Sequence, residues 1–367
     1  MVFAVFFISM LHLMLYVSFC LGLLIQLLSD DTFVTRKNYH HTQEEIVKIL
    51  KKILLVVFII VIVIILAVMA LFAFQSYRFD NYYKFVKTDK PIEAQYTALG
   101  PNEVSSVEFD AENDTYKKYE IWYPSEMKDR SSAYPLVVLA NGTGTPASKY
   151  KSVFKHLASW GFIVVGNEDL NSRTGASSSA SLDFMLKLNE DRESDFYGKI
   201  DVDNIGIGGH SQGGVGTINA VTNQENGDFY KAMFTASATS SFWGQQSQLG
   251  TDWSYDVSKI KIPYFMVAGT GDFDAGTAED ITATEGQGIT PLWSLNTNYS
   301  NIPDTVTKVM ARRVNTDHSD MVNHADGYMT AWFMYWLKGD VQAGNAFFGD
   351  DAELFENANW QDVIRSQ

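Results

Sequence analysis

The segment Gly206–Gly214, GIGGHSQGG, contains two overlapping glycine patterns that would serve different chemistry. Gly206 and Gly208 begin a G-x-G-x-x-G dinucleotide-binding pattern, but Ser211 takes the place of its third glycine. That pattern also belongs on the first strand of its unit, with an acidic residue about 20 positions later at the end of the next strand. Here the segment follows the fifth predicted strand, and Gln224–Asp228 is predicted as a loop. The sequence therefore argues against dinucleotide binding.

The same segment fits the pattern G-x-S-x-G through Gly209, Ser211 and Gly213. In this motif the serine stands on a strained turn from a strand to a helix, which exposes its hydroxyl at the carboxyl edge of a sheet. The flanking sequences agree, because NIGIGG (204–209) is typical of a strand and QGGVGTINAVTN (212–223) of a helix. A glycine-rich turn that happens to contain a serine is the alternative. The strand-to-helix context favours Ser211 as a nucleophile.

A serine hydroxyl needs a base that accepts its proton before it can attack a carbonyl group. In folds with this motif the order along the chain is serine, acid, histidine. Of the seven histidines, only His318 and His324 follow the strand that is expected to carry the acid. His318 lies in the loop NTDHSD, where it can reach back over the sheet edge, whereas His324 lies nearer the closing helix. We therefore predict that His318 is the base and that His324 packs against or caps that helix.

The acid of such a triad holds the imidazole in the right tautomer and stabilises its charged form. It is expected just after the predicted strand IPYFMVAG (262–269), where the chain continues as TGDFD (270–274). Asp272 is the preferred candidate and Asp274 is the alternative. Either could instead be a solvated turn aspartate, because aspartate beside glycine is common in turns.

The oxyanion that forms during attack on an ester needs two preorganised N–H donors. One is expected from the backbone of Gln212, the residue after the nucleophile. The other is expected from the loop NGTGTP (141–146), which follows the predicted strand PLVVLAN (135–141). Its glycines allow the backbone to come close to a substrate. Thr143 is the preferred donor, and Gly142 and Gly144 are the alternatives.

Strand and helix signals alternate along the part of the chain that positions these groups. Continuous apolar runs such as 135–141 and 162–166 predict strands that are buried on both faces, and the alternation at 104–109 and 117–123 is typical of antiparallel strands. Amphipathic runs that end on glycine predict helices. This alternation predicts an α/β fold with a mostly parallel sheet of about eight strands and helices on both faces. The predicted strands are 104–109, 117–123, 135–141, 162–166, 204–209, 231–238, 262–269 and 305–313, and the predicted helices are 148–161, 181–190, 212–223 and 329–339.

Two apolar segments precede this domain. Residues 2–28 carry no charge, and residues 53–74 are 22 consecutive apolar residues. A helix needs about 20 residues to cross a bilayer. A signal peptide usually begins with basic residues, and none precedes the first segment. Both segments are therefore predicted as transmembrane helices, joined by the loop 29–52 into an all-α hairpin.

The charges around these segments predict their orientation. The loop 29–52 carries five basic residues, none precedes the first segment, and four follow the second within residues 78–90. Because positive charge marks the cytoplasmic side, the catalytic part is predicted on the extracellular face of a cell membrane. The only cysteine, Cys20, lies in the first segment, and an outer domain without cysteine suits a bacterial surface. The predicted organisation is a membrane anchor (1–78), a stalk (79–100) and a catalytic domain (101–367).

The overall charge restricts the partners of the protein. The net charge is −15, and residues 1–78 hold six basic and four acidic groups, so the remainder carries −17. Such a domain is not expected to bind nucleic acid or to adhere to anionic lipid by its charge. No spacing typical of zinc ligands occurs, and the serine chemistry needs neither a metal nor an organic cofactor, so neither is predicted.

Residues from about 100 to 340 resemble the α/β-hydrolases, in particular the group of polyester hydrolases (cutinase-like), dienelactone hydrolases and chlorophyllases. The similar stretches are IWYP, VVLANGTGT, HLASWGFIVVGNEDLNS, SSSASL, GIGGHSQGG, VAGTGDFD and DHSDM. The resemblance implies an α/β-hydrolase fold. It implies a nucleophile, an acid, a base and two oxyanion donors at Ser211, Asp272, His318, Thr143 and Gln212.

The resemblance also bears on the substrate. It places Trp243, in SSFWG, where such enzymes keep an aromatic platform beside the acyl group, although a packed aromatic is the alternative. The polyester hydrolases of this group usually have an aromatic residue at the position of Thr143 and a methionine at that of Gln212, which argues against a polyester substrate. The segment 273–304 is long for the group and is predicted to line the rim of the pocket.

Together these features predict a membrane-anchored serine hydrolase that cleaves carboxylic esters through an acyl-enzyme. Its substrate would be a small-molecule, lipid or envelope ester. An acyltransferase that passes the acyl group to an envelope polymer or a lipid would use the same residues and is the first alternative. The second is a surface binding protein on a hydrolase scaffold without turnover, which the complete set of serine, acid and histidine disfavours.

Overall fold

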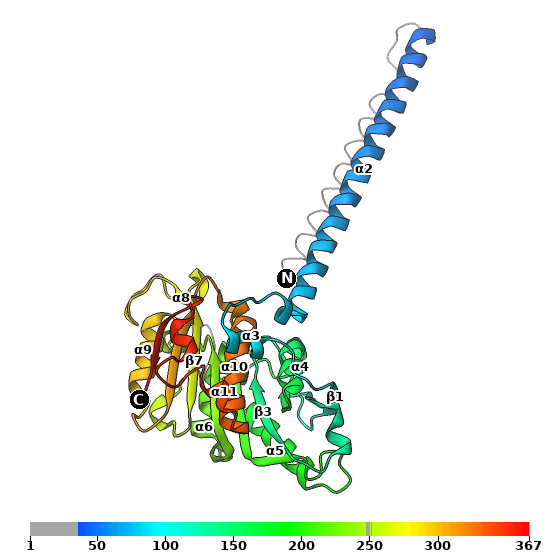
Figure 1. Ribbon diagram of the computed structural model, residues 1–367. Helices are drawn as coiled ribbons and strands as arrows, with labels where there is room; N and C mark the ends of the chain where they lie inside the picture. Colours follow the sequence, from blue (N-terminus) through cyan, green and yellow to red (C-terminus); the bar gives the residue numbers. More distant parts are fainter. Residues whose placement is uncertain (1–35, 247–249, 251, 367) are drawn as a thin grey trace. The chain divides into compact units, whose positions relative to one another are not determined.

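The computed structural model describes residues 36–246, 250 and 252–366 of the 367-residue chain. The chain divides into two compact units, Met1–Ser76 and Tyr77–Gln367. Within the described residues, the first unit contains a single long helix and the second contains the sheet with its helices (Figure 1).

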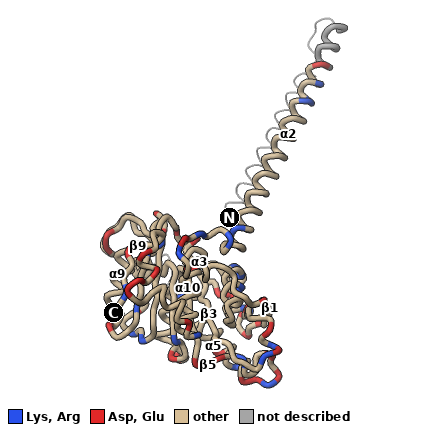
Figure 2. Tube along the Cα trace, in the orientation of Figure 1, with Lys and Arg blue, Asp and Glu red and all other residues tan. Residues whose placement is uncertain are grey.

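The long helix is α2 (Arg36–Asp80, 45 residues), and it contains the predicted segment 53–74. It also takes in most of the predicted loop, because the sequence from Arg36 to Lys52 has no proline or glycine that would end a helix. Figure 2 shows the uncharged stretch that follows Lys52 and ends at Arg78. By length and composition this helix could cross a membrane, and its apolar side chains are not buried in the protein. The other predicted segment, 2–28, lies outside the described residues, so the structure shows one helix of the predicted hairpin.

The second unit is built on a nine-stranded sheet in the order β1-β2-β4-β3-β5-β6-β7-β8-β9. Strands β3 to β8 pair in parallel, whereas β1 and β2 at one end and β9 at the other run antiparallel to their neighbours. This confirms the α/β fold with a mostly parallel sheet. The strands are β1 (Val104–Asp110), β2 (Lys118–Pro124), β3 (Tyr134–Ala140), β4 (Ile163–Asn167), β5 (Ile200–His210), β6 (Tyr230–Ala236), β7 (Tyr264–Gly269), β8 (Lys308–Arg313) and β9 (Trp360–Arg365).

The ninth strand was not predicted from the sequence. Its residues, WQDVIR, are half polar, and only Trp360 among them is buried. As an edge strand it needs one neighbour and little apolar surface, so its sequence resembles a loop. Its pairing with β8 depends on contacts with distant residues, which a local pattern does not reveal.

Helices cover both faces of the sheet, and each face has its own apolar core. Helices α3, α4, α10 and α11 supply the core on one face, and α5, α6 and α9 supply the core on the other. The helix bounds are α3 (Pro91–Thr97), α4 (Lys151–Ser159), α5 (Ala176–Glu190), α6 (Gln212–Asn223), α7 (Ser241–Gly244), α8 (Asp272–Ala275), α9 (Leu292–Asn301), α10 (Met321–Lys338) and α11 (Val341–Gly344).

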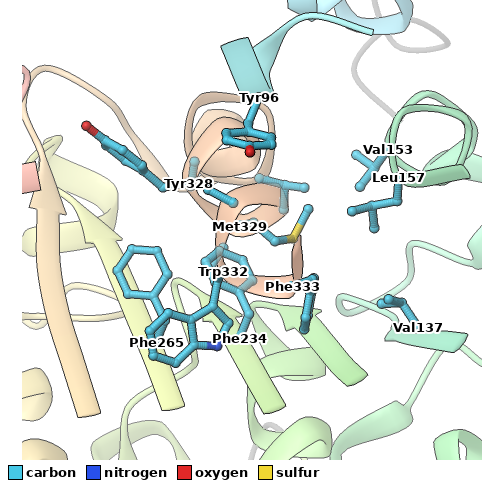
Figure 3. Packing of buried hydrophobic residues seen from close by; sticks show 14 of the residues in the cluster. Tyr96, Val137, Val153, Leu157, Phe234, Phe265, Tyr328, Met329, Trp332 and Phe333 are labelled. Carbon is cyan, nitrogen blue, oxygen red and sulfur yellow. The ribbon is translucent and has the colours of Figure 1, made fainter. Parts of the chain in front are cut away.

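The first of these cores centres on α10, whose aromatic side chains lie over the middle strands (Figure 3). Trp332 is fully buried, packs on Phe265 of β7 and donates its indole N–H to the Met233 carbonyl at 3.1 Å. The helix begins eight residues before the predicted start at 329, because the buried residues of its first turns include polar ones that hide the apolar pattern. It ends, as predicted, at a glycine, Gly339, with a left-handed φ of 68°.

The predicted stalk, 79–100, instead packs into the second unit. Tyr82 and Tyr96 are buried in the core that centres on α10, and Glu93 forms a buried ion pair with Arg313 of β8. Tyr82 also donates its hydroxyl proton to the buried Asp326 carboxylate at 2.5 Å. Aromatic side chains of this segment thus pack against α10, the helix that lies over the middle strands. The folded unit therefore begins near residue 77 and not near residue 101.

Candidate active site

Ser211 occupies the turn between β5 and α6. Its φ of 59° and ψ of −123° lie in a region that non-glycine residues rarely adopt, at a cost of about 1–3 kcal/mol. The Ser211 N–H donates to the Ala236 carbonyl at the end of β6 at 3.0 Å, which ties the strained turn to the neighbouring strand. The strain is the local feature expected of a serine held out at the carboxyl edge of the sheet.

The glycines of the motif are required by close backbone approach. A Cβ on Gly209 would lie 2.2 Å from the Gly213 carbonyl oxygen, and a Cβ on Gly213 would lie 2.2 Å from the Ala140 carbonyl oxygen. No side chain fits between β5, the first turn of α6 and the end of β3. These contacts explain why the turn needs glycine on both sides of Ser211.

The change Gly213→Ala is expected to lower the free energy of unfolding by about 3 kcal/mol or more, because the new methyl group meets backbone that cannot move aside. Thermal unfolding of the full chain measures the loss. Gly349→Ala is the control: unlike Gly213, Gly349 has a positive φ of 93°, and it has open space around its Cβ position, so its loss should come from backbone strain alone and be about 1 kcal/mol. Equal losses in the two variants would contradict the role of the clash.

Ser211, His318 and Asp274 form a continuous hydrogen-bonded chain. The Ser211 Oγ lies 2.9 Å from His318 Nε2, and His318 Nδ1 lies 2.9 Å from Asp274 Oδ1. His318 begins the short helix η8 (His318–Asp320) after β8, and Asp274 lies in α8 after β7. The imidazole can therefore accept the serine proton on one side while it donates to a carboxylate on the other.

The structure corrects the preference for Asp272 as the partner of His318. Asp272 is exposed at the start of α8, whereas the alternative candidate, Asp274, is fully buried and contacts the imidazole. Residues two apart on a helical turn project about 200° from each other, so only one of the two carboxylates can face the histidine. His324, the other histidine considered, lies on α10, and burial together with Arg313 lowers its pKa.

Three further residues, Ser237, Gly269 and Asp317, which the sequence analysis did not single out as site residues, hold this hydrogen-bonded chain in place. Asp274 Oδ2 accepts hydrogen bonds from Ser237 Oγ at 2.5 Å and from the Gly269 N–H at 2.6 Å. Asp317 Oδ1 accepts from the backbone N–H groups of both Asp274 and His318, each at 2.8 Å. The carboxylate of Asp317 thus joins the acid loop to the base loop. The sequence could have indicated this role of Asp317, because it directly precedes His318 in NTDHSD and aspartate is common as the first, capping residue of a helix.

Among the candidate oxyanion donors in the loop 141–146, only Thr143 has an N–H without an acceptor in the described structure. The Gly142 N–H donates to the Tyr150 hydroxyl at 3.2 Å, and the Gly144 N–H donates to the Leu170 carbonyl at 3.1 Å. The Gln212 N–H, at the start of α6, likewise has no acceptor within the described residues. Thr143 and Gln212, the two predicted oxyanion donors, thus each have an N–H group without an acceptor among the described residues.

Trp243 lies in α7, and its indole N–H donates to the Gly288 carbonyl at 2.8 Å. The ring is half-buried, so one part of it stays accessible. Gly288 belongs to the long segment 273–304, which includes α9, so only its first half forms a loop. In the same segment Phe273 is 62% exposed and places its ring edge-on to His318, with 5.6 Å between the ring centroids. This segment therefore borders His318 and holds the indole of Trp243 in place.

Three features define the protein as an α/β-hydrolase. They are a parallel sheet with antiparallel ends, a serine on a strained strand-to-helix turn and a histidine that follows the eighth strand. A family model described as PET hydrolase-like matches residues 81–347, most of the second unit. The chain therefore belongs to the PET hydrolase-like family, and it is a hydrolase of a family that acts on esters. A search of curated proteins found no significant match.

Proposed function

We propose that the protein is a membrane-anchored serine hydrolase that cleaves carboxylic esters, with Ser211 as nucleophile, His318 as base and Asp274 as acid. The observation that carries the proposal is the unbroken chain from Ser211 Oγ through His318 to Asp274, with 2.9 Å at each step. Membership of a family that acts on esters supports the same reaction class. The substrate is an ester that the outer face of a cell meets, such as a lipid or envelope ester.

In the first half of the reaction, the Ser211 Oγ attacks the ester carbonyl carbon while His318 Nε2 takes the hydroxyl proton. The negative charge moves to the carbonyl oxygen, where the N–H groups of Thr143 and Gln212 donate to it. The intermediate collapses, the bond to the leaving alkoxy group breaks, and that group takes the proton from His318. The products of this half are a free alcohol and an acyl ester on Ser211.

In the second half, water attacks the acyl ester and gives a proton to His318 Nε2. The bond to Ser211 Oγ then breaks, the proton returns to Ser211, and the carboxylic acid leaves. The carboxylate of Asp274 faces the imidazolium that forms in each half. The accessible part of Trp243 would support the acyl group.

The position of the enzyme follows from the apolar segments. Helix α2 would anchor the chain, with the segment 2–28 as a second span. Five basic residues precede the apolar part of α2, compared with four between Arg78 and Lys90. This small excess favours a cytoplasmic loop and an outer catalytic unit.

Labelling of intact cells with a membrane-impermeant fluorophosphonate tests the nucleophile and the orientation together. Cells that express the full chain should be labelled, and cells that express Ser211→Ala should not, because the probe reacts only with an activated serine. Labelling that appears only after lysis would overturn the outer location while it leaves the nucleophile in place. Absence of labelling both before and after lysis would overturn the proposed chemistry.

A further inference from the structure

His210, the residue before the nucleophile, connects the two loops that the reaction uses. Its Nε2 lies 2.9 Å from the His318 carbonyl oxygen, and its Nδ1 lies 3.3 Å from the Tyr150 hydroxyl. The same hydroxyl accepts the Gly142 N–H at 3.2 Å. A hydrogen-bonded path therefore runs from the oxyanion loop, through Tyr150 and His210, to the backbone of the base.

The chemistry of the partners fixes the direction of every bond in this path. A carbonyl oxygen only accepts, so His210 Nε2 must carry a proton. Burial and the nearby His318 lower the pKa of His210 to about 4, so the ring is neutral near pH 7 and Nδ1 is an acceptor. The Tyr150 hydroxyl must then donate to Nδ1, which leaves its oxygen free to accept from Gly142. Burial raises the pKa of Tyr150 to about 12, so the hydroxyl keeps its proton.

We propose that Tyr150 and His210 are positioning residues, which form a one-directional relay from the Gly142 N–H to the His318 carbonyl and hold the oxyanion loop and the base in register. This inference rests on the proposed function, since it assigns a task within the same reaction. By accepting the Gly142 N–H, the Tyr150 hydroxyl fixes the orientation of the peptide group between residues 141 and 142. This group adjoins the one that carries the Thr143 N–H. By binding the His318 carbonyl, it fixes the backbone that carries the imidazole.

The surroundings make the relay sensitive to the loss of one hydroxyl. A small cavity of about 20 Å³ lies beside Tyr150 and His210, and its other walls include Val153, Phe234 and Met329. These apolar side chains cannot replace a lost hydrogen bond. Removal of the Tyr150 hydroxyl would therefore leave the Gly142 N–H without an acceptor and His210 Nδ1 without a donor.

The relay also requires a neutral His210. The ring centroids of His210 and His318 are 4.8 Å apart, and Tyr150, His318 and Asp274 are the titratable groups that face His210. During catalysis His318 becomes an imidazolium, and a second positive charge at this distance would oppose that step. A proton on Nδ1 would also turn it into a donor and reverse the bond to Tyr150. The low pKa of His210 prevents both events near neutral pH.

The test is a double-mutant cycle on the full chain with Tyr150→Phe, His210→Phe and the double variant, assayed with a soluble ester. Each single change is expected to lower kcat about 10-fold with KM nearly unchanged, because the relay acts on the reacting groups and not on substrate binding. The double variant should be no slower than the worse single variant, because either change breaks the same path. Tyr230→Phe is the matched control, since the buried Tyr230 hydroxyl has no hydrogen-bond partner among the described residues, and its kcat should stay within twofold of wild type.

Tyr150→Phe with unchanged kcat, or single effects that multiply in the double variant, would overturn the relay. If His210→Phe fails to fold, a comparison of kcat between Tyr150→Phe and Tyr230→Phe still tests the relay, because each change removes one buried hydroxyl and keeps the aromatic ring. The outcome is separate from the proposed function itself. An inactive wild-type protein that no fluorophosphonate labels would refute the function, whereas an active wild type with an equally active Tyr150→Phe would refute only the relay.

Discussion

Replacement of Ser211 by alanine is expected to lower kcat for ester hydrolysis by about 10⁶-fold, the largest effect of any single change in this protein. The alanine leaves His318 in place but removes the hydroxyl oxygen that lies 2.9 Å from its Nε2 and would form the acyl-enzyme. The remaining N–H groups of Thr143 and Gln212 could still polarise a bound ester. A weak residual rate above that of water alone is therefore expected.

Steady-state hydrolysis of a chromogenic ester by the purified full chain measures this loss. Ser152→Ala is the matched control, because the buried hydroxyl of Ser152 in α4 has no hydrogen-bond partner in the part of the chain that the structure describes, and the change should leave kcat within twofold of wild type. Thermal unfolding should show that Ser211→Ala is folded, because alanine keeps the backbone and Cβ of the serine and removes only the hydroxyl group. A folded Ser211→Ala variant that retains a tenth of the wild-type rate would refute Ser211 as the nucleophile.

The second large effect is expected at Asp274, where Asp274→Asn should lower kcat by about 10⁴-fold. The carboxylate oxygen Oδ2 accepts from Ser237 and Gly269, so an asparagine would direct its carbonyl oxygen to these donors and its NH₂ group to His318. The imidazole would then carry its proton on Nε2, the nitrogen that faces Ser211. In that tautomer it cannot accept the serine proton, although the packing of the site is preserved.

The control for this prediction is Asp272→Asn, two residues earlier in the same helical turn. Asp272 is exposed and does not contact the histidine, so its kcat should stay within about twofold of wild type. Both variants remove one negative charge near the site. Comparing their kcat values therefore separates the effect of the His318 tautomer from the effect of the lost charge. A larger loss from Asp272→Asn than from Asp274→Asn would return the role of the acid to Asp272.

Much of the fold could be predicted because it is determined by local pattern. The eight predicted strands all occur. Buried strands such as 135–141 and 162–166 are continuous apolar runs, and 104–109 and 117–123 show the alternation of antiparallel strands, so neither pattern requires knowledge of the neighbouring strands. The uninterrupted run 53–74 likewise becomes part of one long helix. By contrast, β9 and the packing of residues 82–97 depend on surfaces formed by distant parts of the chain, and their own sequences are too polar or too short to show this.

The residues of the candidate site likewise fall into those that the sequence could predict and those that only the structure could place. The sequence alone determined the places of Ser211 and His318, because a strand-to-helix glycine motif and the chain order of the triad leave few choices among serines and histidines. Only the tertiary structure decided between Asp272 and Asp274, since the twist of a single helical turn turns one carboxylate into the core and the other into solvent. It also distinguished Thr143 from its neighbours, because Tyr150 and Leu170 occupy the N–H groups of Gly142 and Gly144. Motifs specify which elements meet, but the direction in which each side chain and each peptide N–H points is set by the residues packed around it.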